Sequence, residues 1–134
     1  EEVRRPREPL RVTPGGPATP PLTGHHAMNE TVVVFCTVPD AGKAADIARA
    51  LVEARLAPCA NIVPAVRSIY TWKGRLFDEN EVLMVLKTRR SLVPRLREAI
   101  VSLHPYEVPE IVALELVDVH PPYLQWLLEN TDDA

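Results

Sequence analysis

Residues 31–38 read TVVVFCTV, a run in which β-branched and apolar residues occupy both alternating faces. Such a run predicts a central strand that is buried on two sides. Pro39 ends the strand, and Asp40 is placed to cap a following helix. Residues 41–57 carry apolar side chains at helical spacing, which predicts an amphipathic helix that Pro58 stops.

The next part of the sequence predicts two long strands joined by a tight turn. Residues 59–72 contain Pro64, so this strand is expected at a sheet edge, bulged or bent at the proline. Residues 73–75 form the turn, with Gly74 supplying a positive φ. Residues 76–89 return with a polar start, expected to project beyond the body, and an apolar end, expected at the sheet centre.

The last part of the sequence predicts a helix, a strand and a short final helix. Ser91 is expected to cap the first of these helices, with Pro94 in its first turn and His104 at its end. Its expected buried stripe consists of Leu92, Leu96, Ala99, Ile100 and Leu103. A strand over residues 110–119 follows, and Pro121 opens the C-terminal helix.

The predicted order is β-α-β-β-α-β plus a C-terminal helix, which is the ferredoxin-like, split-βαβ pattern of an α+β fold. Right-handed crossovers place both long helices on one face of the sheet. The strands at 31–38 and 76–89 are nevertheless apolar on both faces. A bare apolar face of that size favours aggregation, and a second copy of the chain is its natural cover. We therefore expect an obligate homo-oligomer formed through the sheet.

Composition separates a globular domain from a different kind of N-terminal segment. The 134 residues carry 15 Lys and Arg against 18 Asp and Glu, and the net charge of −3 argues against a strongly basic nucleic-acid binder. Six of the 14 prolines fall within residues 1–27, which predicts a disordered Pro/Gly-rich leader, or an extension upstream of a start at Met28, before a domain over residues 28–134. His25 and His26 are either a metal-binding pair or chance neighbours in that segment.

Two further features of the composition concern the compartment of the protein. No apolar run reaches the roughly 18 residues that a membrane-spanning helix needs. The two cysteines lie far apart in the sequence, which argues against a disulfide scaffold and for a reducing compartment.

Six blocks of the sequence resemble the divalent-cation tolerance (CutA) family. In order, they are 33–40 (VVFCTVPD), 56–61 (LAPCAN), 68–74 (SIYTWKG), 81–82 with 86–88 (EV and LKT), 104–110 (HPYEVPE) and 123–127 (YLQWL). Together they cover essentially all of residues 31–128 at the spacing of the family. The resemblance does not extend to residues 1–27.

The resemblance implies a ferredoxin-like subunit in a compact homotrimer that is similar to the PII signalling proteins and cytoplasmic in bacteria. It implies a non-enzymatic protein that binds copper or other divalent metal ions and takes part in divalent cation tolerance. Two other functions stay open, namely a PII-like sensor of a small molecule or nucleotide and a trimeric structural adaptor. No glycine-rich phosphate loop, recognisable Ser-His-Asp set or CxxC motif favours an enzyme.

The resemblance also implies a copper site at Cys36 and His104. The family uses the cysteine at this position with histidines just before the Pro-Tyr pair, and Leu103 stands where some relatives carry the first histidine. A thiolate is a soft ligand suited to Cu(I) or zinc, whereas the alternative for Cys36 is a buried small hydrophobe. The alternative for His104 is a structural role at a helix C-terminus. A third ligand would come from a neighbouring chain or from water.

A second set of candidates combines aromatic and charged side chains. It consists of Tyr70, Trp72, Glu81, Lys87, Tyr106, Glu107 and Glu110. Strand alternation places Tyr70 and Trp72 on one face. Aromatic rings with convergent charges are typical of a ligand pocket. They are also typical of an intersubunit seam in which Lys87 pairs with a glutamate, and the two interpretations are compatible.

Two weaker candidates remain. Cys59 begins the predicted edge strand, so a disulfide with Cys36 is not expected, and its thiol is either a ligand or simply buried. Residues 78–81 (DENE) either attract a hard cation or form the solvated start of a strand. No EF-hand spacing supports a calcium site there.

Overall fold

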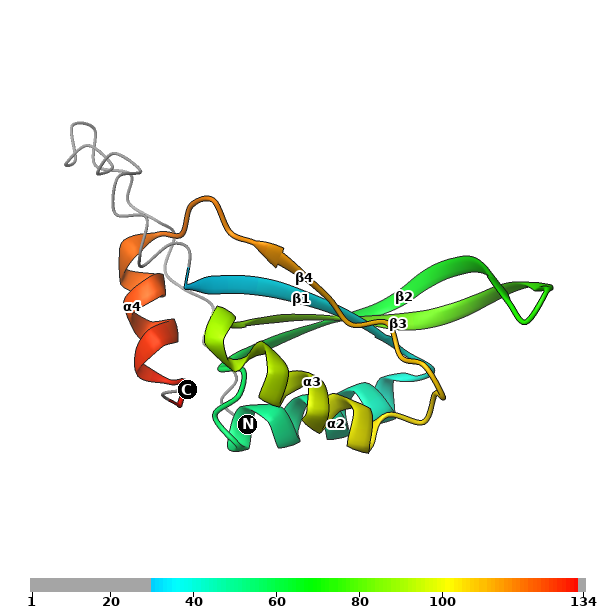
Figure 1. The fold of residues 1–134 in the computed structure, drawn as a ribbon, viewed down its shortest axis with the longest axis horizontal. Coiled ribbons are helices and arrows are strands. Elements are labelled where there is room, and N and C mark those ends of the chain that lie inside the picture. The colour runs from blue at the N-terminus through cyan, green and yellow to red at the C-terminus, as the bar shows by residue number, and fades with distance from the viewer. Residues whose placement is uncertain (1–29, 133–134) are drawn as a thin grey trace.

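A four-stranded antiparallel sheet with two helices against one face forms the body of the protein (Figure 1). It is described by a computed structural model over residues 30–132. The elements are β1 (Thr31–Val38), α2 (Ala41–Glu53), β2 (Cys59–Trp72), β3 (Arg75–Arg89), the 3-10 turn η1 (Arg90–Leu92), α3 (Val93–Leu103), β4 (Val112–Glu115) and α4 (Pro121–Glu129). This order, with the strands arranged β2-β3-β1-β4, confirms the predicted β-α-β-β-α-β pattern and its C-terminal helix.

The predicted leader at residues 1–27, with His25 and His26, lies outside the described residues. Within residues 30–132, no helix combines the length and the hydropathy needed to cross a membrane.

β1 is central in the sheet, paired antiparallel with β3 on one side and with β4 on the other. Its even-numbered side chains, from Val32 to Val38, pack against α2 and α3 and are almost completely buried. The rest of this core includes Ile47, Leu51, Met84, Leu86, Leu96 and Ile100. Since each fully buried large apolar side chain contributes roughly 1.5–3 kcal/mol, this core holds both helices to one face of the sheet.

The opposite face of the sheet is also apolar, and no helix of the described chain covers its centre (Figure 1). The strand register places Phe35 between Val85 of β3 and Val112 of β4. Val112 and Leu114 are each 46% exposed, and Val33 and Phe35 are partly exposed. The prediction that β1 is apolar on both faces while the long helices cover only one is confirmed.

α2 begins as predicted but ends earlier. Asp40 caps the helix, because its side chain accepts a hydrogen bond from the backbone N–H of Lys43 at 2.8 Å. The expected end at Pro58 is wrong, since the last helical residue is Glu53.

A Schellman-type turn causes this early end. Arg55 takes a left-handed conformation with φ of 60°, and its backbone N–H bonds to the Val52 carbonyl at 3.0 Å. The N–H of Leu56 bonds to the Leu51 carbonyl at 3.0 Å, which completes the motif. The chain therefore turns early, and Leu56 is buried in the core instead of continuing the helix.

The predicted cap of the second long helix is also wrong. Ser91 lies inside η1, and α3 follows with Leu92 as its N-cap and with no side-chain cap hydrogen bond. Pro94 lies in the first turn as predicted, where no backbone donor is required. Leu103 was expected to be buried but is 41% exposed, because it is the last helical residue and the chain becomes extended at His104.

β2 and β3 form a long hairpin that projects beyond the two helices (Figure 1). β2 lies at the sheet edge, and its register shifts between Val63 and Val66, so the predicted irregularity at Pro64 is confirmed. Lys73 and Gly74 form the turn, and both have a positive φ, of 51° and 76°. These values are typical of the two-residue turn whose twist matches that of the strands.

β4 is shorter than the strand predicted over residues 110–119. It pairs only with Val32–Phe35 of β1, and all its residues are exposed. As an edge strand with a single neighbour, it ends where this pairing ends.

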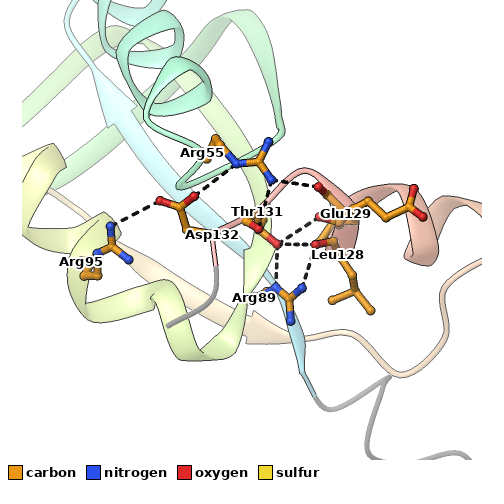
Figure 2. A network of polar contacts seen from close by, with 8 residues as sticks. Arg55, Arg89, Arg95, Leu128, Glu129, Thr131 and Asp132 are labelled. Carbon is orange, nitrogen blue, oxygen red and sulfur yellow. Dashed lines mark hydrogen bonds and ion pairs between the residues drawn. The ribbon is translucent and has the colours of Figure 1, made fainter.

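Two arginines fix α4 and the residues after it to the rest of the domain (Figure 2). Arg89 donates hydrogen bonds to Thr131 Oγ1 at 2.6 Å and to the Leu128 carbonyl at 2.7 Å. Arg55 donates to Asp132 Oδ1 at 3.2 Å. The left-handed residue that ends α2 therefore also anchors the C-terminal segment.

Candidate functional site

A cleft of about 610 Å³ lies between the projecting hairpin and the loop that joins α3 to β4. The strand pairing places residues 66, 68, 70 and 72 of β2 on the same face as residues 75, 77, 79 and 81 of β3. Six of the seven predicted aromatic and charged residues line the cleft: Tyr70, Trp72, Glu81, Tyr106, Glu107 and Glu110. The structure therefore brings together most of a set that is scattered over the sequence.

Lys87 is the member that the structure does not bring to the cleft. The register places it opposite Cys59, at the other end of the hairpin pairing. Its Nζ contacts Asn61 Oδ1 and lies 3.9 Å from Cys59 Sγ. Within the described chain Lys87 therefore contacts an amide and a thiol, and its pairing with a glutamate in an intersubunit seam stays a prediction.

Glu81 is the buried charge of the cleft, with only 6% of its surface exposed. The hydroxyl of Tyr106 donates to its Oε2 at 2.6 Å. Burial of the Tyr106 phenol raises its pKa, and the hydrogen bond to Glu81 raises it further. The phenol therefore stays protonated at neutral pH and acts as a donor.

Tyr70 forms a similar pair on the hairpin. Its hydroxyl donates to Glu79 Oε1, and this hydrogen bond raises the pKa of Tyr70 to about 12. Its ring stacks on Phe77 with the ring centres 5.3 Å apart. The stacking fixes the orientation of the Tyr70 ring, which lines the cleft.

An ammonium group lies at the rim of the cleft. Lys73 Nζ is 3.6 Å from Glu107 Oε2 and 5.5 Å from the centre of the Trp72 ring. This is the geometry of a cation that is shared by a carboxylate and an aromatic face.

Cys36 and His104, the predicted copper ligands, both approach the backbone carbonyl of Thr37. Cys36 Sγ lies 3.8 Å from this oxygen and His104 Nε2 lies 2.7 Å from it. The backbone N–H of Tyr106 donates to His104 Nδ1 at 3.0 Å, so in the neutral ring Nε2 carries the proton and donates to Thr37. Both ring nitrogens of His104 are thus engaged in holding the loop.

The thiol of Cys36 is held in its protonated form. Its side chain is fully buried in the core. Burial raises the pKa of the thiol to about 12, and the negative charges of Glu110 and Glu81 add to this effect. A thiol in this state is neither a nucleophile nor a ready metal ligand at neutral pH.

Comparison with known proteins places the chain in a family. The family model described as "CutA1 divalent ion tolerance protein" matches residues 32–130. This chain belongs to the CutA1 family. The mouse "Protein CutA" is 45% identical over 132 residues, which cover 96% of this chain and 75% of the mouse protein. The "Divalent-cation tolerance protein CutA" of Thermus thermophilus is 50% identical over 99 residues, which cover 74% of this chain and 96% of that protein.

Solved CutA1 structures have the same fold. The Thermus thermophilus structure superposes with a TM-score of 0.74 at 49% identity, covering 76% of this chain and 99% of that one. The Oryza sativa CutA1 structure gives a TM-score of 0.77 at 35% identity, covering 81% and 99%. The family resemblance seen in the sequence is therefore confirmed, and so is the α+β architecture with its antiparallel sheet.

In this CutA1 chain the predicted ligands do not fit a resident metal ion. Across residues 30–132 no group of three His, Cys, Asp or Glu side chains is placed to hold one. The thiol of Cys36 is protonated, and both nitrogens of His104 are engaged. Leu103, at the position of the missing histidine, offers no donor atom.

Sequence reasoning did not assign two groups to the site. Glu79 was named only within the acidic stretch 78–81, although it lies two residues before Glu81 on the same strand face, so period-two alternation pointed to it. The Thr37 carbonyl had no signal, because backbone contacts across the fold leave no mark in the residue types. Asp78, in the same acidic stretch, is paired with Arg67 at 2.6 Å, in line with the solvated strand start described above.

Proposed function

We propose that this chain acts as a non-enzymatic, cytoplasmic homotrimer in tolerance to divalent metal ions. Family membership and the name of the Thermus thermophilus relative support the link to divalent cations. The two free cysteines are in keeping with a reducing compartment.

The geometry around Cys36 supports a binding role over nucleophilic catalysis. A catalytic cysteine needs a base that accepts its proton. Here His104 Nε2 donates to the Thr37 carbonyl, so it is not available as an acceptor for the thiol proton. The raised pKa of Cys36 has the same consequence.

The uncovered sheet face supports the homotrimer. Phe35, Val85 and Val112 form an apolar row across three neighbouring strands. Both outer strands, β2 and β4, leave one edge without a partner strand within the described chain. Other copies of the chain would cover the face and pair with the edges.

Cys36 and His104 both lie close to the Thr37 carbonyl, and this proximity is the observation that supports the metal-binding part of the proposal. The metal is cargo here, and it binds only when the thiol gives up its proton and His104 releases its hydrogen bond to Thr37. Because binding releases protons, affinity should rise with pH. The softness of sulfur favours Cu(I) over harder divalent ions, with Zn(II) next.

Calorimetric titration of the full chain with Cu(I), Cu(II) and Zn(II) tests this role. We expect weak Cu(I) binding that tightens between pH 6 and pH 8 and is lost in Cys36→Ala. Cys59→Ala is the matched control, because it removes the other thiol, which lies on the opposite face of the sheet. Identical binding by the unmodified chain and Cys36→Ala would remove Cys36 from the site.

A further inference from the structure

The cleft is lined by acidic and aromatic side chains, and the proposed role in metal tolerance does not involve them. Three of its lining residues are acids and three are large aromatic residues, and the lining contains no lysine or arginine. A PII-like sensor could bind a small molecule or a nucleotide. An acidic lining disfavours a nucleotide, because its phosphates carry negative charge at neutral pH.

Glu81 presents an unpaired carboxylate oxygen to the cleft. It is more than nine-tenths buried, and its only polar partner among the described residues is the neutral Tyr106 hydroxyl on Oε2. Its second oxygen receives no hydrogen bond from the described chain, and among the described residues no side-chain oxygen is both buried and unpartnered, so this oxygen is open to the cleft that Glu81 lines. A carboxylate oxygen held at a cleft wall in this way is placed to pair with a cation from solvent.

The geometry favours an organic cation over a metal ion. Hard metal ions take six or more oxygen ligands, and residues 30–132 offer no group of three suitable side chains. Aromatic rings, by contrast, bind ammonium and guanidinium groups through their faces. The cleft volume of about 610 Å³ is in the range of small-molecule sites.

The chain itself supplies an example of this recognition at the rim. Lys73 places its ammonium 3.6 Å from Glu107 and 5.5 Å from the centre of the Trp72 ring. Tyr70 and Tyr106 show the negative field further inside, because neighbouring carboxylates help to raise the pKa of both phenols. A free amine would meet the same pairing of carboxylate and ring near Glu81.

We propose that this cleft is a binding site for a small aliphatic amine or guanidinium compound. Its charged head lies at Glu81, and its apolar body lies against the Tyr70 and Trp72 rings. The Cys36 side chain faces the core, whereas the cleft lies on the other side of Thr37, so the proposed amine site adjoins the proposed metal site without sharing its thiol.

Three isosteric probes test the proposal on the full chain. Putrescine is the dication, 1,4-butanediol is its neutral counterpart, and succinate is the anion. Binding is read from the fluorescence of Trp72 in a Trp126→Phe background, since the chain has two tryptophans. We expect putrescine to bind, with affinity falling as salt rises, and the other two to show no binding at 10-fold higher concentration.

Variants then locate the bound charge. Glu81→Gln should weaken putrescine binding at least 10-fold, whereas Glu98→Gln, an exposed acid on α3, should leave it unchanged. Tyr106→Phe keeps the carboxylate, so binding should persist within a few-fold even if stability falls. Cys36→Ala should leave putrescine binding intact, so this result is independent of the metal test.

Three results would overturn the proposal. Equal binding of putrescine and 1,4-butanediol would show that charge is not recognised. Glu81-dependent binding of Zn(II) without putrescine binding would make the cleft a metal site. A crystal structure with a neighbouring subunit filling the space at Glu81 would give this carboxylate its partner within the assembly and leave no room for a ligand.

Discussion

The thiol of Cys36 is made inert by its position in the core, and this has a consequence for stability. Its pKa is about 12 in the folded chain against an ordinary value of 9.0. Between these values the unfolded chain loses the proton while the folded chain keeps it, so the free energy of unfolding falls as pH rises above 9. For one thiol, the loss between pH 9 and pH 10 is about 1 kcal/mol per chain.

Urea unfolding at pH 7, 8, 9 and 10 measures this loss. Cys36→Ala should lower stability at every pH but should flatten the decline between pH 9 and 10. Cys59→Ala should keep the decline. The pKa values of Tyr70 and Tyr106 are also raised, from an ordinary value of 10.0, and their effect has the same sign, so a smaller decline between pH 9 and 10 should remain in Cys36→Ala. A decline of the same size in Cys36→Ala would contradict the assignment.

Single positions also mark the limit of what the sequence reveals. The helix cap at Asp40 could be predicted, because a short acidic side chain directly before an apolar periodic run is typical of an N-cap. Arg55 gave no such signal, because glycine is the usual residue at the left-handed end of a helix. The structure gives a reason for an arginine, whose side chain donates to Asp132 and to the Glu129 carbonyl.

Among the elements, the long hairpin was the most predictable and β4 the least. Two long predicted strands on either side of a Lys-Gly turn allow only one antiparallel pairing, and Pro64 indicated where that pairing is irregular. The extent of β4 depends on how far β1 offers a free edge, which is a property of the assembled sheet. The cleft could not be located from the sequence for a similar reason. Its hairpin and loop residues lie far apart in the sequence and come together only in the folded chain.

The attachment of α4 rests on Arg89, and this can be tested. Arg89→Met removes charged donors to Thr131 Oγ1 and to the Leu128 carbonyl in a partly buried setting. We expect a loss of about 1.5–3 kcal/mol in the free energy of unfolding. Hydrogen–deuterium exchange over α4 should also become faster, because its last turn loses its anchor.

Arg95→Met is the matched control for this change. Arg95 contacts Asp132 at 3.6 Å on the surface, where such pairs contribute less than about 1 kcal/mol. In Arg95→Met, hydrogen–deuterium exchange over α4 should stay close to that of the unmodified chain. Equal losses in both variants would show that Arg89 acts only as a surface charge.

At the scale of the whole molecule, the two faces of the sheet differ in how far the chain buries them. α2 and α3 bury one face, while Phe35, Val85 and Val112 on the other remain partly or largely exposed in the single chain. Periodicity alone revealed that both faces are apolar. Periodicity does not give the number of copies that cover the second face, because that number depends on the shape of the assembled surface. The expectation of a trimer therefore rests on the family resemblance alone.

Substitution of Phe35 by glutamate tests this cover directly. The unmodified chain should sediment as a particle of three chains, and its Tm should rise with protein concentration, because assembly and folding are linked by mass action. Phe35→Glu places a charge in the centre of the uncovered face, so we expect a monomer or a precipitate with a lower Tm. Val101→Glu is the control, because Val101 is 52% exposed on α3, on the helical side of the sheet. It should assemble like the unmodified chain. A stable lone subunit of the unmodified chain, with a Tm independent of concentration, would mean that water can cover this face.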